Sequence, residues 1–95
     1  MVSTEPTHPN LDTAVGLGAE ALRRGADVYL YLIDEAVAAV EDPRVQDLAD
    51  RGLKLFVCAY GCQRRRQPLS DRATNCGLVV LTDIVNGTDR FVSLN

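Results

Sequence analysis

The chain has 95 residues, of which 46% are hydrophobic and 24% charged, a composition that fits one small globular domain and excludes a disordered or fibrous protein. Its formal net charge of −3 argues against nucleic acid as a partner, and no apolar run approaches the ~20 residues that cross a membrane. The three cysteines are an odd number, and the first ten residues lack the basic and apolar parts of a signal peptide. We therefore expect reduced thiols and a cytoplasmic location.

The first predicted element is a helix that follows a Pro-containing start. Residues 1–9 contain two prolines, and we expect them to form a loop or a disordered segment. Asn10 is a good helix cap, so the helix should begin at residue 11, where apolar residues start to recur at helical spacing. Two arginines close this pattern and Gly25 follows them, which predicts a helix end near residue 24.

Two strongly apolar runs, at 27–33 and 53–59, predict strands that are covered on both faces. The Ala-rich segment 34–40 between them has room for one or two helical turns. A helix is predicted over 43–51, because Asp42 is a good cap and a proline occupies the first helical position. Strands that alternate with helices in this way indicate a layered α/β domain with a mainly parallel sheet.

The last third of the chain has weaker local patterns. Residues 62–67 predict a short helix that ends before Pro68. Residues 78–85 are rich in β-branched side chains, which favours a strand, yet their apolar positions also fit a helix. Residues 90–94 predict a final short strand.

The most informative stretch is 53–66, in which an apolar, β-prone run ends in Cys58, passes through a turn of small residues and continues into three consecutive arginines. In open α/β sheets, ligands bind outside the carboxyl ends of the strands. A thiol at that place, near cationic side chains and a helix N-terminus, is positioned to ionise and react. We therefore predict that Cys58 is at least partly open to solvent and that Arg64 or Arg65 favours its thiolate.

Three segments resemble the DsrE family of small sulfur-relay proteins, which includes TusD-like subunits. They are the run 53–66, the preceding ALRRGADVYLYLIDEAV and the closing TDRFVSLN, and the resemblance covers the chain from Thr4 to the end. Its most specific element is a strand that ends in cysteine, followed by small residues and a basic pair. In this chain the element consists of Cys58, Ala59-Tyr60-Gly61 and Arg64-Arg65, and the closing Asp89-Arg90 is also similar to the family.

The resemblance implies both a fold and a chemistry. The fold is a three-layer α/β/α sandwich with a mainly parallel sheet, formed by residues 1–95 and assembled into homo- or hetero-oligomers, and it makes 78–87 a helix. The chemistry is that of a sulfur carrier in which Cys58 holds sulfur as a persulfide. The implied partners are TusA-like or rhodanese-like sulfur-relay proteins, and no cofactor is implied. The residues that we expect to form the binding site beside the thiol are Tyr60, Gly61, Arg64 and Arg65.

The start of the chain departs from the family pattern. Family members open with an apolar strand before the Pro-containing loop, whereas only Met1-Val2-Ser3 precede Thr4 here. A strand of ordinary length needs about 5–6 residues. Either the first strand is lost or very short, or the chain as given begins too late, in which case the upstream DNA should encode a short apolar run in frame. An empty inner position in the sheet would expose unpaired backbone unless a neighbour fills it.

Each cysteine has a structural alternative to a functional role. Cys58 is either the reactive thiol or a buried core residue, since free cysteine is among the most buried residue types. Cys62 is either a resolving thiol for Cys58 or a small side chain packed at a helix start. Cys76, next to a glycine, is interpreted as structural. A zinc site is disfavoured, because no paired Cys-x-x-Cys occurs and the fourth ligand would have to be His8.

Two functions remain open on these residues. One is a sulfur carrier or sulfurtransferase, in which the Cys58 thiolate attacks a sulfane sulfur and passes it to a partner thiol. The other is a non-catalytic subunit that keeps the fold and acts in oligomer assembly. The apolar segment 36–40, in a chain too short for a large core, further predicts an oligomer surface. The sequence contains no phosphate-binding loop, nucleotide fingerprint or Ser-His-Asp pattern.

Overall fold

The computed structural model describes the whole chain, residues 1–95, and has a three-stranded sheet at its centre. The strands are β1 (Tyr29–Leu32), β2 (Lys54–Cys58) and β3 (Thr74–Cys76), in the order β1-β2-β3. Both neighbouring pairs are parallel, so the predicted α/β fold with a parallel sheet is confirmed. β1 and β2 are shorter than the predicted strands. β3 lies where no strand was predicted, because its three residues carry no apolar alternation.

The two ends of the chain extend this sheet beside β1. Val2 forms parallel single-residue bridges with Leu32 on one side and with Leu94 on the other, and it is only 1% exposed. The segment that we expected to be a loop or a disordered lead-in therefore contributes its beginning to the sheet. The strand predicted over 90–94 is wrong, since only Leu94 is bridged. The segment at Val2, which is its neighbour in the sheet, has too little extended backbone for a longer ladder, because the chain turns at Pro6-Thr7.

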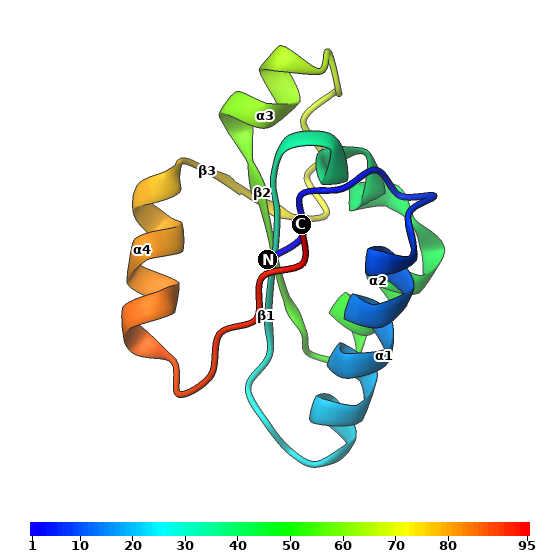
Figure 1. Ribbon diagram of the computed structural model, residues 1–95, viewed down its shortest axis with the longest axis vertical. Helices are drawn as coiled ribbons and strands as arrows, with labels where there is room; N and C mark the ends of the chain where they lie inside the picture. The colour runs from blue at the N-terminus through cyan, green and yellow to red at the C-terminus, as the bar shows by residue number, and fades with distance from the viewer.

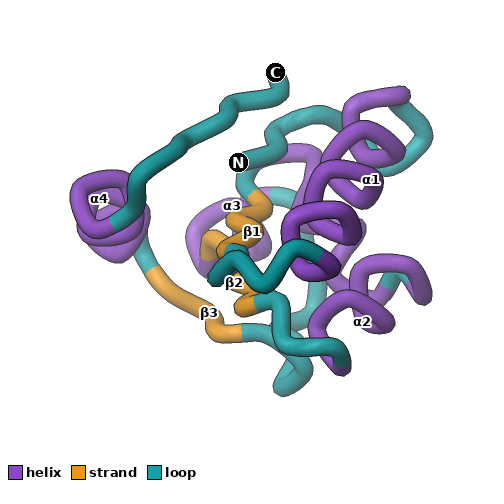
Figure 2. The backbone as a smooth tube through the Cα atoms, turned by 90° about the horizontal axis from the view of Figure 1, so that it is seen from below, coloured by secondary structure: helices purple, strands orange, loops and turns teal.

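Three helical elements pack on one face of the sheet, as Figures 1 and 2 show. They are α1 (Pro9–Arg23), the 3₁₀ helix η1 (Asp34–Glu41) and α2 (Pro43–Asp50). This face carries alternate residues of β1 and β2, and together with the helices they make the hydrophobic core. The sheet residues of the core are Leu30, Leu32, Leu55 and Val57. The apolar segment 36–40 belongs to this core as well, with each of its four core members at most 1% exposed, so the oligomer surface expected there is wrong.

Helix α1 begins two residues earlier than predicted. Its cap is His8, whose imidazole Nδ1 accepts the Asn10 N–H at 3.1 Å, and Pro9 takes the first helical position. Proline suits that position because its missing N–H would be unpaired there in any case. The predicted end is confirmed within a residue, and Gly25 just beyond it has a φ of 82° that glycine adopts without strain.

Helix α4 (Leu78–Gly87) lies on the opposite face of the sheet from α1 and α2 (Figure 2). From edge to edge, the order in the sheet is Leu94, Val2, β1, β2 and β3. From Val2 to β3, each connection leads to the next strand in one direction, whereas the connection from β3 to Leu94 runs back across the whole sheet. A right-handed crossover in the reversed direction must pass over the other face. The helix that the resemblance implied over 78–87 is thus confirmed, against the local β propensity. None of the helices combines the length and the apolar composition that a membrane span requires.

Helix α2 has the predicted cap. The Asp42 carboxylate accepts the backbone N–H of Arg44 at 2.9 Å, and Pro43 follows it at the first position of the helix. The Arg44 guanidinium pairs with the same carboxylate and holds the pKa of Asp42 below its ordinary value. Because the folded-state pKa is the lower one, this contribution to stability is complete above about pH 4, the unfolded value, and is lost as the pH falls further.

Replacing Asp42 by alanine should therefore lower the free energy of unfolding by about 1 kcal/mol at pH 7, the usual cost of a lost helix cap. Urea unfolding followed by circular dichroism at pH 7 and pH 3 measures it. Asp42→Asn is the matched control, since an asparagine caps equally well without a titrating charge. It should keep most of the stability at pH 7 and lose less than the wild type at pH 3. Equal stability of Asp42→Ala and wild type at pH 7 would contradict the assignment.

Candidate functional site

Cys58 is the last residue of β2 and the cap of the short helix α3 (Ala59–Arg64). Its backbone is still extended, with φ −69° and ψ 112°, and its Sγ accepts the Gly61 N–H at 3.4 Å. The predicted location at the carboxyl end of a central strand is therefore where the structure places this thiol. The predicted exposure is wrong, because Cys58 is only 4% exposed. Helix α3 begins at once, at Ala59 instead of Cys62, and the N–H of Gly61 in its first turn donates to the sulfur.

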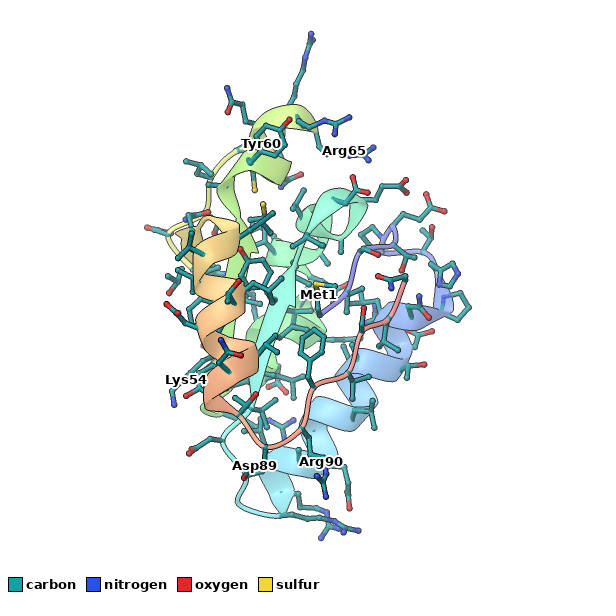
Figure 3. The ribbon with its side chains drawn as sticks, turned by 60° about the vertical axis from the view of Figure 1, so that its left-hand side comes forward. Met1, Lys54, Tyr60, Arg65, Asp89 and Arg90 are labelled. Carbon is teal, nitrogen blue, oxygen red and sulfur yellow. The ribbon has the colours of Figure 1, made fainter.

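Gly61 allows this close packing of α3 on the core. A Cβ at this position would lie 3.1 Å from Val37 Cγ1 and 3.2 Å from the backbone N of Asp34, both in η1. These separations are shorter than ordinary carbon contacts, so a side chain would push α3 away from η1. Because Gly61 has no side chain, α3 can pack close enough to η1 for the Gly61 amide to reach the Cys58 sulfur. Tyr60 lies on the outside of α3, 63% exposed (Figure 3).

The arginines after α3 are engaged elsewhere. Arg65 forms an ion pair with Asp34, which follows the end of β1 closely, and a longer contact of 3.9 Å with Glu35. The hydrogen bond to Asp34 raises the pKa of Arg65. Arg64 is the last residue of α3, at the opposite end of the helix from Cys58. Neither arginine forms a hydrogen bond or an ion pair with the Cys58 thiol. The contact with a cationic side chain that we expected for Cys58 is therefore not seen.

Cys62 points into the core. It is 1% exposed and belongs to the same buried cluster as the residues of η1 and α2. Burial raises the pKa of the Cys62 thiol, and the neighbouring Cys58 raises it further. A buried thiol with a raised pKa has little thiolate at neutral pH. The packing alternative for Cys62 is the one that this environment favours.

Two residues that sequence reasoning did not place in the site lie beside Cys58. Cys76, the last residue of β3, is the direct register partner of Cys58. Its Sγ lies 3.7 Å from the Tyr31 hydroxyl oxygen, and Tyr31 donates its hydroxyl proton to the carbonyl of Gly77 at 2.8 Å. Tyr31 is 2% exposed, and burial first, then the neighbouring Cys76 and Cys58, raise the pKa of its hydroxyl.

The sequence contains a faint signal for Cys76. Both Cys58 and Cys76 stand at the end of an extended segment immediately before a helix begins, Cys76 with one glycine in between. The spacing alone does not show that the two are side by side, because that depends on how β2 and β3 are aligned. No local pattern marks Tyr31 as a site residue, because an aromatic residue in a predicted strand is just as typical of the hydrophobic core.

A cavity of about 580 Å³ has none of the three cysteines in its lining, although Tyr31, which contacts Cys76, is part of it. It lies between α1 and β1 on one side and α4 with residues 88–94 on the other, and its lining is mostly apolar. None of the predicted site residues lines it. Figure 3 shows Asp89 and Arg90, which do line it, at the opposite end of the molecule from Tyr60 and Arg65. No group of three His, Cys, Asp or Glu side chains is arranged to hold a metal ion.

Comparison with known proteins bears on the fold. No protein-family model matches the chain, and no curated protein matches its sequence significantly. Among solved structures, the chain is similar to the ychN protein from E. coli, with a TM-score of 0.77 and 22% sequence identity, covering 98% of this chain and 95% of that one. A likeness at this level of identity shows the fold alone. The chain therefore has the DsrE-like fold of this neighbour, an open all-parallel sheet with helices on both faces.

Proposed function

We propose that this protein is a small sulfur carrier that holds sulfane sulfur as a persulfide on Cys58 and passes it to the thiol of a partner. The observation that carries the proposal is the position of Cys58 at the carboxyl end of β2, with its Sγ on the Gly61 amide at the start of α3. Strand ends of this kind are where open α/β sheets bind and transform ligands. The DsrE-like fold supports the proposal, because the sequence around Cys58 resembles that family.

The chemistry needs a thiolate and a donor. The Cys58 thiolate attacks the sulfane sulfur of a donor such as thiosulfate, forms a new S–S bond and expels the remainder, here sulfite. An acceptor thiolate on the partner then attacks the outer sulfur, takes it as its own persulfide and releases Cys58 as thiolate. The Gly61 N–H is placed to donate to the negative sulfur at the beginning and at the end of this cycle, and a charged acceptor strengthens such a hydrogen bond.

A buried thiol requires α3 to move for the donor to enter. Helix α3 has only 6 residues, and helices shorter than ~12 residues are marginal without tertiary contacts. The ion pair of Arg65 with Asp34 joins two side chains that are 41% and 54% exposed, and exposed pairs contribute little to stability. A local displacement of α3 must break the packing of Gly61 and Cys62 on the core, but it leaves the sheet itself intact. TusA-like or rhodanese-like proteins in a reducing, cytoplasmic setting are the partners that we propose for the exchange.

The alternative function is a non-catalytic subunit of an assembly. The burial of Cys58 and the ion pair of Arg65 with Asp34 favour this alternative, because a cysteine and an arginine with purely structural roles would have the same environments.

Treatment of the purified protein with thiosulfate or inorganic polysulfide, followed by intact-protein mass spectrometry, distinguishes the two functions. A carrier gains the mass of one sulfur atom, whereas a structural subunit does not.

We further propose that the chain forms a homo- or hetero-oligomer through the apolar surface of α4 and the segment after it. Five large apolar side chains are exposed here, which are Leu78 at 55%, Val79 at 76%, Val85 at 37%, Phe91 at 45% and Val92 at 52%. No residue of α4 is buried, although six of its ten residues are Leu, Val or Ile. Exposed large apolar side chains concentrated in one part of the chain favour an interaction site there.

Light scattering at micromolar concentration should give a mass above the 10.3 kDa of the monomer. Val79→Glu should shift it toward the monomer, because a carboxylate is costly to bury without a partner. Leu69→Glu is the matched control. Leu69 is an exposed apolar residue, 63% exposed, that lies outside α4, and its replacement should leave the mass unchanged. A monomer mass for the wild type would contradict the proposal.

A further inference from the structure

Cys58 and Cys76 form a pair across neighbouring strands. They are opposite each other in the parallel register of β2 and β3, each at the last residue of its strand. Register partners point to the same face of a sheet, and neighbouring strands are about 4.8 Å apart. A disulfide needs a Cα separation of roughly 4.4–6.8 Å and Cβ atoms on the same side. The backbone of this pair therefore fits a disulfide without a change in the sheet.

The side chain of Cys76 is held toward β2. Its Sγ lies 3.9 Å from the carbonyl oxygen of Val57, the residue before Cys58, and 3.7 Å from the Tyr31 hydroxyl oxygen. Tyr31 belongs to β1, so its side chain reaches across the end of β2 to Gly77, just beyond β3. Burial is the main cause of the raised pKa of the Tyr31 hydroxyl, and the neighbouring Cys76 and Cys58 add to it.

We infer that Cys76 is the resolving thiol of Cys58, which discharges a persulfide on Cys58 when no acceptor protein takes the sulfur. The inference rests on the proposed function for its persulfide step. The Cys76 thiolate attacks Sγ of the Cys58 persulfide, forms the Cys58–Cys76 disulfide and breaks the bond to the outer sulfur, which leaves as hydrosulfide. The outer sulfur is reduced to sulfide, the two cysteines are oxidised to the disulfide, and an external dithiol reductant restores both thiols.

Cys62, the other candidate for this role, is less suited to it. It packs in the core on the face of the sheet that η1 and α2 cover, and it is less exposed than Cys76, which is only partly buried. A resolving thiol must become a thiolate and reach the persulfide, and both are hindered in an apolar cluster. Sequence spacing points to Cys62 and the strand register points to Cys76, so the two assignments make different predictions.

Tryptic peptides distinguish them. Cleavage after Lys54, Arg64, Arg72 and Arg90 leaves Cys58 and Cys62 together in peptide 55–64 and Cys76 in peptide 73–90. The wild type is loaded with inorganic polysulfide, freed of excess reagent and incubated alone, and free thiols are then blocked before digestion without reductant. We expect release of sulfide and a disulfide that links peptide 55–64 to peptide 73–90. In Cys76→Ser the persulfide should persist at least about tenfold longer, because an intramolecular thiol has a large kinetic advantage.

Cys62→Ser is the matched control and should discharge like the wild type. Loss of two hydrogens within peptide 55–64, or equal persulfide lifetimes in Cys76→Ser and wild type, would overturn the inference. Diamide, which takes two hydrogens from a pair of thiols, tests the pair without any persulfide. If diamide links peptide 55–64 to peptide 73–90 in a protein that never loads sulfur, the Cys58–Cys76 pair is supported and the carrier function is contradicted. If diamide forms no such link in a protein that does load sulfur, the Cys58–Cys76 pair is overturned while the carrier function is kept.

Discussion

Cys58→Ser should abolish the sulfur adduct that the wild type acquires from thiosulfate or polysulfide. A serine hydroxyl is not ionised at neutral pH and cannot hold sulfane sulfur, whereas the Cys58 thiolate is the proposed nucleophile. Serine is also a preferred helix cap, so its Oγ takes over the hydrogen bond from Gly61 and α3 remains in place. Intact-protein mass spectrometry measures the adduct, and circular dichroism verifies that the fold is kept.

Cys62→Ser is the control for this variant, because it removes a thiol four positions away that has no primary role in the proposal. It should load to the same extent as the wild type when its fold is intact. An adduct of equal size in Cys58→Ser would place the sulfur on another residue and end the carrier interpretation of Cys58. Failure of the wild type to load from a competent donor, with a partner present, would leave the structural subunit as the function.

Gly61→Val should destabilise the protein by roughly 1–3 kcal/mol, the usual cost of inserting atoms into a well-packed core. The new Cβ would meet Val37 Cγ1 at 3.1 Å and the Asp34 backbone N at 3.2 Å, and the second of these cannot move without η1. Because α3 must then shift, the Gly61 amide also leaves the Cys58 sulfur, and loading should become slower. Urea unfolding and the time course of the adduct measure the two effects.

Gly16→Ala is the control for the same kind of change. Gly16 lies within α1, and a Cβ there meets no atom within 4 Å. Alanine at that position should stabilise the protein by roughly 0.5–1 kcal/mol, because it restricts the unfolded chain more than glycine does. If Gly61→Val were as stable as the wild type, the close contact between α3 and η1 would not be what positions the amide.

The elements whose ends are marked by local chemistry could be predicted closely from the sequence. Asp42 followed by Pro43 specifies the start of α2 within the chain itself, since the cap and the fixed φ of proline act on neighbouring residues. The run 53–59 likewise predicts β2, because it is apolar except for Lys54 and rich in β-prone residues, and the strand ends at Cys58. The position of Cys58 at a strand end follows directly from this pattern.

Other elements depend on partners that are distant in the sequence. Residues 78–87 have the local propensity of a strand but form a helix, because the chain must cross a face of the sheet between β3 and Leu94. The segment 74–76 is polar and short, and it is a strand only because β2 offers it a free edge. Arg65 could be expected near Cys58 by sequence distance, yet it pairs with Asp34, which the fold brings to it from the end of β1.

By itself, the sequence determined the alternation of helices and strands, the parallel sheet and the strand-end thiol, since each of these follows from hydrophobic pattern and capping within about a dozen residues. Only the tertiary structure decided that Cys58 is buried, that Val2 joins the sheet and that Cys76 and Tyr31 lie beside the thiol. The physical reason is register. Which residues of β1, β2 and β3 face one another depends on how the strands align when the whole core packs.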